Sequence, residues 1–275
     1  MTIQQTLVKA MTALRMSGAT SVALDAEVLL SHVLRCTKAQ LLAAPERRLT
    51  LSQSQRFGRL VRERKKGWPV AYLIGHKEFY GLDFIVSPRV LIPRPDTEVL
   101  VDTVLQTMPK DARLSIADVG TGSGCIAVTL AKYLPRASIT AFDISAPALG
   151  VAKKNALRHK MGKRIRFFRG DLLWQAHKKR FDCIVANLPY LTPDQLTLVP
   201  FEPVVALLGG KLGVEHIDRL LQSAPAHLTR FGQMFLEIDP RQSDIIAYIV
   251  QQLMPGKTVK FVKDLGARVR VARIG

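Results

Sequence analysis

The sequence has few cysteines and lacks the spacings that hold a metal ion or a disulfide framework. Its three cysteines, Cys36, Cys125 and Cys183, lie far apart and form no C-x-x-C pair. Its six histidines form neither an H-x-x-x-H nor an H-E-x-x-H pattern. Because zinc sites and small disulfide-bonded domains depend on such spacings, we expect no metal site and interpret the cysteines as small core residues.

Long apolar runs are also missing. No apolar segment of the sequence approaches the roughly 18 residues that a membrane span requires. The first residues, MTIQQTLVKAMTALRMSG, have polar side chains spread through them, unlike the compact apolar block of a signal peptide. We therefore expect a cytoplasmic protein that is not embedded in a membrane.

Acidic residues are scarce relative to basic ones. The 275 residues include 40 Lys plus Arg and only 22 Asp plus Glu, which gives a formal net charge of +18. Such a charge attracts anionic partners in general without identifying a site, so we expect a non-specific attraction to RNA or to the ribosome. With 48% hydrophobic and 23% charged residues, the chain is otherwise typical of a globular protein, and we expect a monomer.

The hydrophobic periodicity divides the chain into three parts. Residues 1–75 show the helical period and predict a small helical bundle, whose first helix is capped by Thr2 and stopped by Gly18. Residues 76–92 hold two short strand-like runs around Gly81, which predict a β-hairpin that links the parts. Residues 93–275 begin with a proline-rich connection and a helix from about Thr97.

Strand and helix patterns alternate in the third part. Strands are predicted at 114–120, 138–143, 164–168, 181–187, 233–239, 258–263 and 267–273, and helices at 124–134, 146–159, 214–229 and 241–253. This alternation predicts an α/β fold, a doubly wound and mostly parallel sheet with helices on both faces. The last two strands follow one another directly and predict an antiparallel hairpin that finishes the sheet.

A glycine-rich loop follows the first of these strands. In ADVGTGSGCIAV, Gly120, Gly122 and Gly124 lie between strand and helix, where backbone can approach a ligand and free N–H groups favour negative charge. Asp143 ends the next strand, where a carboxylate can accept hydrogen bonds from both ribose hydroxyls. The G-x-G-x-G spacing differs from the G-x-G-x-x-G of dinucleotide sites. It favours a ligand with an amino-acid tail, S-adenosylmethionine, over NAD.

Two further carboxylates belong to this prediction. Asp118 directly precedes the glycine loop and is expected to help hold the ammonium group of the same ligand. Asp171, in FFRGDLLW, follows the third strand of the sheet. A carboxylate at that place can accept a hydrogen bond from an adenine amino group while Leu172 packs against the ring.

The segment DCIVANLPYLT ends the fourth parallel strand with Asn187, Leu188, Pro189 and Tyr190. Ligands of doubly wound sheets bind beyond the carboxyl ends of the strands, so this loop is expected beside the glycine loop. An amide or exocyclic amine is too weakly acidic for a side chain to deprotonate it beforehand. The Asn187 side-chain oxygen, the Leu188 main-chain oxygen and the Tyr190 ring would instead orient a planar nitrogen for methyl transfer by proximity and preorganised dipoles.

Together these motifs resemble class I methyltransferases that modify planar nitrogens. PRPDTE at 93–98, EPVVALLGG at 202–210 and LEIDPRQ at 236–242 are similar to the bacterial protein-(glutamine-N5) methyltransferases, and the helical N-terminal region and KDLGAR match the branch that acts on peptide chain release factors. The resemblance covers nearly the whole chain. It implies the Rossmann-like class I fold with a mixed seven-stranded sheet, S-adenosylmethionine as cofactor, and methylation of the glutamine amide in the Gly-Gly-Gln loop of release factors. Residues 1–75 would then recognise the substrate, and residues 93–275 would form the methyltransferase domain.

The resemblance also implies roles for individual residues. The cofactor positions are Gly120, Thr121, Gly122, Ser123, Gly124, Asp143, Asp171, Leu172 and Asn187. The substrate positions are Asn187, Leu188, Pro189 and Tyr190, with Asn187 and Tyr190 as the catalytic residues. Leu188 departs from the family's usual proline, and because proline restricts φ we expect a looser loop. Asp239 in LEID replaces a usual glycine, and the sequence offers no physical reason for this change.

Two other functions stay open at this stage. A nucleic-acid methyltransferase of the adenine N6 type handles an amino group with the same Asn-x-Pro-Tyr arrangement, and a charge of +18 would suit its substrate. No separate nucleic-acid-recognition module is evident in the sequence, which favours a protein substrate. The second alternative is a cofactor-binding, ribosome-associated protein with weak or no catalysis, and Leu188 is its only support.

Overall fold

The computed structural model describes residues 1–16, 21–198 and 200–275. The chain divides into two compact units, Met1–His76 and Lys77–Gly275. Gly18, the predicted end of the first helix, lies outside the described residues. Among the helices that are described, none has the length and apolar character needed to cross a membrane.

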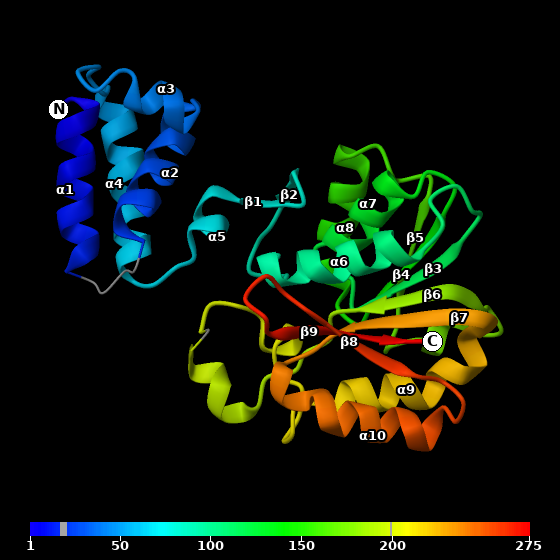
Figure 1. Ribbon diagram of the computed structural model, residues 1–275. Coiled ribbons are helices and arrows are strands. Elements are labelled where there is room, and N and C mark those ends of the chain that lie inside the picture. Colours follow the sequence, from blue (N-terminus) through cyan, green and yellow to red (C-terminus); the bar gives the residue numbers. More distant parts are fainter. Residues whose placement is uncertain (17–20, 199) are drawn as a thin grey trace. The chain divides into compact units, whose positions relative to one another are not determined.

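The first unit is a helical bundle (Figure 1). Its helices are α1 (Ile3–Arg15), α2 (Val22–Leu34), α3 (Lys38–Leu42), α4 (Leu51–Lys65) and α5 (Val70–Ile74). Thr2, Thr37 and Thr50 cap α1, α3 and α4, and in each case a glutamine three residues later completes the capping box. The apolar faces of the helices meet in a core that includes Leu14 and Leu29. The predicted helical region is confirmed, and the short helices α3 and α5 were not predicted.

The second unit is built on a seven-stranded sheet with the order β5-β4-β3-β6-β7-β9-β8. The strands are β3 (Ser115–Val119), β4 (Ser138–Asp143), β5 (Ile165–Arg169), β6 (Phe181–Ala186), β7 (Leu228–Glu237), β8 (Val259–Lys263) and β9 (Val269–Ile274). Strands β3 to β7 are parallel, and β9 is antiparallel to both β7 and β8. The predicted mixed sheet is confirmed. The last strand does not form its edge, because β9 carries buried Val271 and Ala272 and takes the inner position, whereas β8 is more exposed.

Helices cover both faces of this sheet (Figure 1). One face carries α6 (Pro95–Thr107), α7 (Cys125–Tyr133) and α8 (Ala146–Arg158), and the other carries α9 (Glu215–His227) and α10 (Ser243–Leu253). Helix α6 begins at Pro95, two residues before the predicted start at about Thr97, because Arg94 is its N-cap and a proline suits the first helical position. Helix α10 begins at Ser243, since Pro240–Gln242 form a separate 3-10 turn.

A small hairpin, β1 (His76–Phe79) and β2 (Leu82–Ile85), precedes α6. Its turn contains Gly81 with φ +68. The side chain of Asn155 in α8 joins this hairpin to the glycine loop. It accepts from the N–H of Ile85 at 2.8 Å and donates to the carbonyls of Ile85 and Ser123, each at 2.9 Å. A residue of α8 therefore fixes the entry into α7.

Candidate active site

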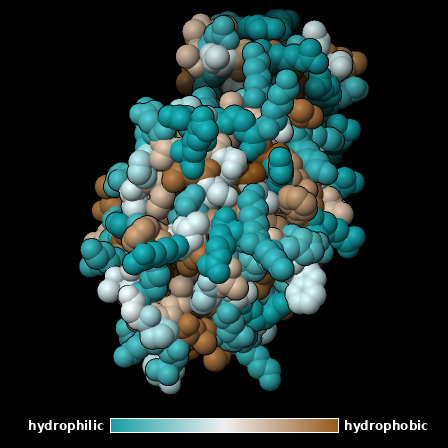
Figure 2. All heavy atoms as spheres, turned by 90° about the vertical axis from the view of Figure 1, so that its right-hand side faces the viewer, coloured by the Kyte–Doolittle hydropathy of each residue, from teal (hydrophilic) through white to brown (hydrophobic). Residues whose placement is uncertain are grey.

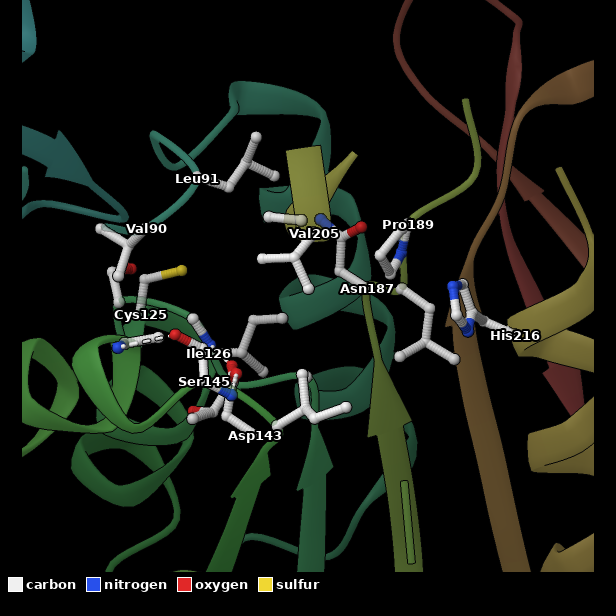
Figure 3. A pocket seen from close by; sticks show the side chains of 18 of the residues that line it. Val90, Leu91, Cys125, Ile126, Asp143, Ser145, Asn187, Pro189, Val205 and His216 are labelled. Atoms are coloured by element: carbon white, nitrogen blue, oxygen red, sulfur yellow. Dashed lines mark hydrogen bonds between the residues drawn. The ribbon is translucent and has the colours of Figure 1, made fainter. Parts of the chain in front are cut away.

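A cavity opens at the carboxyl ends of the parallel strands (Figure 3). Its volume is about 340 Å³, which lies in the range of small-molecule sites, roughly 300–1,000 Å³. The predicted site residues that line it are Gly120, Thr121, Gly122, Ser123, Asp143, Asp171, Leu172, Asn187, Leu188 and Pro189. Residues from several distant segments thus come together as the rule for doubly wound sheets predicts.

The glycine loop lets the end of β3 approach the Asn187 loop closely. Gly120 has φ +76 and Gly122 has φ +54, in the left-handed region that favours glycine. A Cβ atom at Gly120 would lie 3.1 Å from Cδ2 of Leu188 and 3.5 Å from the Asn187 carbonyl oxygen. The Gly120 N–H donates to the Phe142 carbonyl at 2.9 Å, which ties the loop to β4. A side chain at Gly120 would therefore push apart the two loops that line the cavity.

Gly124 has a packing role in the structure that the sequence motif did not indicate. It is the N-cap of α7 with φ +79, and a Cβ atom there would lie 3.0 Å from Cβ of Ala152 in α8. It is not among the residues that line the cavity. Gly124 allows α7 and α8 to pack closely, and direct contact between Gly124 and the cofactor stays a prediction.

Asp118 lies beneath the cavity and does not line it. Its side chain is fully buried, and Oδ2 accepts hydrogen bonds from the Thr121 hydroxyl at 2.6 Å and the Ala127 N–H at 3.1 Å. Burial raises the pKa of Asp118 to about 7. Oδ1 of Asp118 is buried and has no hydrogen-bond partner among the described residues, and the expectation that Asp118 helps to hold a ligand's ammonium group stays a prediction. Through Oδ2, Asp118 holds the Thr121 side chain and the first turn of α7 in place.

Asp143 and Asp171 reach the cavity from the ends of β4 and β5. Asp143 accepts from the Gly122 N–H through Oδ2 and from the Ser145 N–H through Oδ1, both at 2.8 Å. Burial raises the pKa of Asp143. Each carboxylate oxygen has a second lone pair, so two ribose hydroxyls can still bind. Asp171 forms an ion pair with Arg219 of α9, which holds its carboxylate at the rim.

The Asn187 loop follows β6, and three of its four predicted substrate residues line the cavity. Asn187 donates from Nδ2 to Oγ1 of Thr97 at 3.1 Å. Leu188 is buried in the core beside the glycine loop. Tyr190 is not among the lining residues, and its hydroxyl donates to Oε1 of Glu237 at 3.5 Å. Burial raises the pKa of Tyr190 above its usual value, and its predicted role as a stacking surface is not tested by this geometry.

A glycine-containing segment supports this loop from behind, and no role for it was evident in the sequence. A Cβ atom at Gly209 would lie 2.6 Å from the Pro189 carbonyl oxygen, and one at Gly213 would lie 2.4 Å from the Tyr190 carbonyl oxygen. The Gly209 N–H donates to the Leu191 carbonyl at 2.8 Å. The only signal for this contact was the motif EPVVALLGG itself. The glycines are needed because two stretches of main chain touch here.

A second unpredicted contact joins the two segments that form the cavity rim. Glu202 is buried, accepts from the Ile92 N–H at 3.3 Å and forms an ion pair with Arg94. Burial raises the pKa of Glu202, and Arg94 opposes that rise. Val204 and Val205 follow directly and line the cavity while remaining 57% and 56% exposed. The buried carboxyl of Glu202 therefore fixes the segment that places Val204 and Val205 at the cavity rim.

Known proteins match this chain in sequence and in structure. A family model described as PrmC N-terminal domain matches residues 5–75, and one described as Methyltransferase small domain matches residues 97–206. A release factor glutamine methyltransferase of Koribacter versatilis is 40% identical over 279 residues, 99% of each chain. The chain belongs to the release factor glutamine methyltransferase family. Another member, from Moorella thermoacetica, is 38% identical over 98% of this chain and 97% of its own.

A solved methyltransferase structure from Pyrococcus furiosus supports the fold of this family member. It is 22% identical, covers 80% of this chain and 97% of its own, and has a TM-score of 0.55. This likeness shows the class I methyltransferase fold, which agrees with the sheet order and the helices on both faces. The fold implied by the sequence motifs is thereby confirmed.

S-adenosylmethionine is the cofactor of this methyltransferase fold, and the cavity residues fit its chemistry. Gly120 and Gly122 leave space for close approach of a ligand, and Asp143 offers acceptors for ribose hydroxyls. Asp171 and Leu172 offer an acceptor and an apolar contact for adenine at the same cavity. Among the described residues, no cluster of His, Cys, Asp or Glu could hold a metal ion.

Proposed function

We propose that this protein transfers a methyl group from S-adenosylmethionine to the side-chain amide nitrogen of the glutamine in the Gly-Gly-Gln loop of peptide chain release factors. Its membership of the release factor glutamine methyltransferase family supports this activity. The observation that carries the proposal is that Asn187 lines the same cavity as Gly120–Ser123 and Asp143. A glutamine amide bound against Asn187 would therefore lie beside the cofactor.

The chain's own residues would act by orienting the amide nitrogen. The bound cofactor supplies an electrophilic methyl group on a sulfonium sulfur. The Asn187 side-chain oxygen and the Leu188 carbonyl oxygen would accept hydrogen bonds from the two amide N–H groups, which places the nitrogen toward the methyl group. Apolar side chains such as Val90, Ile126 and Val205 line the cavity and limit the access of water. Methyl transfer would break the bond between the sulfur and the methyl carbon and release a neutral thioether, and the amide proton would pass to solvent after the new N–C bond has formed.

Residues 1–75, which include the region matched by the PrmC N-terminal domain, would bind the body of the release factor while its glutamine enters the cavity. The face drawn in Figure 2 carries mostly hydrophilic side chains with small apolar areas between them. The formal charge of +18 would add a salt-dependent attraction to RNA or to the ribosome. We further propose that the protein acts as a monomer in the cytoplasm, where release factors meet ribosomes.

Peptide mass spectrometry can test this activity directly. The full chain is incubated with labelled S-adenosylmethionine and the release factor of the same organism, and the added methyl group is located by fragmentation. We expect the label on the glutamine of the Gly-Gly-Gln loop, and its loss in Asn187→Ala. Label on RNA and none on the factor would contradict the proposal in favour of a nucleic-acid substrate. Cofactor binding with no transfer to either would contradict it in favour of a non-catalytic protein.

A further inference from the structure

Two buried polar residues lie behind Asn187 and have no part in the reaction as proposed so far. Thr97 is in the first turn of α6 and Glu237 is the last residue of β7, and each is 2% exposed. Asn187 donates from Nδ2 to the Thr97 hydroxyl oxygen at 3.1 Å. The nearby Thr97 hydroxyl lowers the pKa of the Glu237 carboxyl, against the rise that burial causes. The three side chains form a polar chain from the cavity into the protein interior.

The direction of these hydrogen bonds decides which end of the Asn187 carboxamide faces the substrate. A threonine hydroxyl has one proton, and an ionised carboxylate can only accept. When Thr97 donates its proton to Glu237, its oxygen is left to accept from Asn187 Nδ2. The Asn187 side-chain oxygen then points away from Thr97. Because the oxygen and nitrogen of a carboxamide are alike in size, hydrogen bonds determine its orientation.

The surroundings of Glu237 suggest that its carboxyl is retained for function. Oε1 receives the Tyr190 hydroxyl at 3.5 Å, and Oε2 has no hydrogen-bond partner among the described residues. Asp96 and Arg270 face it from α6 and β9, and Arg270 also pairs with Asp96 at 3.0 Å. Burial raises the pKa of Glu237 to about 7. A buried carboxylate with an unpaired oxygen destabilises a fold, so packing alone does not account for it.

We propose that Thr97 and Glu237 are positioning residues for methyl transfer, which hold the Asn187 carboxamide with its oxygen toward the substrate amide. This inference rests on the proposed function. With the oxygen facing the substrate, Asn187 accepts a hydrogen bond from the glutamine N–H. With the carboxamide reversed, its NH2 group would meet another N–H group and no hydrogen bond could form. Glu237 also holds the Tyr190 hydroxyl, so the same carboxyl orients two residues of the substrate loop.

Paired substitutions at Thr97 test the hydroxyl. Thr97→Val keeps the shape of the side chain and removes the donor, whereas Thr97→Ser keeps the hydroxyl. We expect Thr97→Val to lower kcat about 10- to 100-fold, the range known for residues that orient the ligands of metal sites through hydrogen bonds. The KM for S-adenosylmethionine should stay within about twofold, and Thr97→Ser should restore most of the kcat. Wild-type kcat in Thr97→Val, or equal losses in both variants, would overturn the proposal.

The pH profile of Glu237→Gln tests the carboxyl. In the wild type, kcat should rise as pH increases through about 7. The ionised carboxyl of Glu237 can only accept from Thr97, whereas the protonated carboxyl can also donate to Thr97 and allow the reversed carboxamide. Gln can donate to Thr97 and allow the reversed carboxamide, so Glu237→Gln should be slow and lack this rise. Of the groups that face Glu237, the pKa of Arg270 is raised by Asp264 and that of Tyr190 is raised by burial, so neither titrates in this range.

A second buried carboxyl, that of Asp118, offers another explanation for a rise in kcat near pH 7. Burial raises the pKa of Asp118 to about 7 as well. If the rise in kcat persists unchanged in Glu237→Gln, it belongs to Asp118 or another group, and the role assigned to Glu237 is overturned.

Nuclear magnetic resonance of the full chain without cofactor separates this inference from the proposed function. The Asn187 side-chain NH2 protons should exchange slowly with solvent in the wild type and at least about tenfold faster in Thr97→Val, because one proton loses its buried acceptor. Equal exchange rates would overturn the positioning role even in an active enzyme. If the wild type fails to methylate a release factor while Thr97 still protects these protons, the proposed function is contradicted. The orientation of the Asn187 side chain by Thr97 is then still supported.

Discussion

Leu188 shows how packing can hold a loop that lacks its usual proline. Its side chain is 5% exposed, and its Cδ2 atom would touch any side chain placed at Gly120. The leucine therefore contacts the glycine loop directly, whereas a proline would restrict φ without reaching as far. The loop is anchored by apolar contact, and its backbone keeps a freedom that proline would remove.

We expect Leu188→Pro to raise kcat by about two- to fivefold. The reason is a smaller loss of backbone entropy in the productive loop, worth about 0.4–1 kcal/mol. Turnover on a release factor is the measurement. Leu188→Ala is the control, because it removes the packing without restricting φ, and it should lose about 2–5 kcal/mol of stability with no gain in kcat. Equal kcat values for Leu188→Pro and the wild type would show that loop rigidity does not limit the reaction.

Asp239 has a physical explanation in the structure that the sequence did not provide. It is the N-cap of the 3-10 turn Pro240–Gln242, and its side chain accepts from the Arg241 N–H at 2.9 Å. The Arg241 side chain also donates to it at 2.8 and 2.7 Å. These hydrogen bonds lower the pKa of Asp239. The aspartate in place of glycine therefore stabilises the turn that leads from β7 into α10.

Removal of this cap should weaken the fold modestly. We expect Asp239→Ala to lower the free energy of unfolding by about 1 kcal/mol, the typical value for loss of an N-cap acceptor. Asp239→Asn keeps the acceptor and should lose less than half of that. Urea unfolding followed by circular dichroism measures both. A loss in Asp239→Asn as large as in Asp239→Ala would assign the effect to the Arg241 ion pair instead.

Among the elements, the substrate loop after β6 depends on a neighbouring segment far away in sequence. Gly209 and Gly213 leave no room for a Cβ atom, because main-chain atoms of Pro189 and Tyr190 occupy that space. The bridge between Leu191 and Leu208 continues this contact. The loop that offers Asn187 is therefore held from behind by backbone, and its position depends on the close approach of the two segments.

A methyl group at Gly209 should displace the substrate loop. The Cβ atom of Gly209→Ala would lie 2.6 Å from both the Pro189 carbonyl oxygen and the Tyr190 Cα atom, and main chain cannot move aside cheaply. We expect kcat to fall by at least about tenfold, since small misplacement of reacting groups is costly. Gly150→Ala in α8 is the matched control, because its Cβ would meet nothing within 4 Å. It should leave kcat unchanged and slightly stabilise the helix.

At the scale of the whole molecule, the second unit carries buried carboxyls whose ionisation opposes folding. Burial raises the pKa of Asp118 and of Glu237 to about 7 in each case, far above the roughly 3.9 and 4.3 of exposed groups. The folded chain therefore binds more protons than the unfolded chain between about pH 4 and 7, so these groups make stability fall as pH rises. In the first unit His32, whose pKa is lowered by burial and nearby Arg56, acts in the opposite direction.

The pH dependence of stability should become shallower in Asp118→Asn. For one such carboxyl the free energy of unfolding falls by at most about 1.4 kcal/mol per pH unit over this range. Chemical unfolding of wild type and variant at pH 5, 6, 7 and 8 gives the difference between their free energies of unfolding at each pH. The contributions of the other titrating groups cancel in this difference. The variant should gain stability relative to the wild type as pH rises. A flat difference curve would show that Asp118 is ionised in the fold at low pH.

Local patterns in the sequence determined the elements and the chemistry of the cavity. The glycine loop, Asp143 and Asn187 were predicted together because each follows a strand, and parallel strands bring their carboxyl ends to one edge of a sheet. The motifs around them also identified the family. These signals depend on residues within a few positions of one another, so they can be read without knowledge of the folded chain.

Only the tertiary structure decided which distant segments touch. It placed β9 between β7 and β8, because the more apolar strand takes the buried position. It put Asp118 under the cavity and Gly124 between two helices, contacts that the glycine-loop motif did not indicate. It also joined Asn187 to Thr97 and Tyr190 to Glu237. Hydrogen bonds between residues so far apart along the chain depend on how complete elements pack, and no local pattern records that packing.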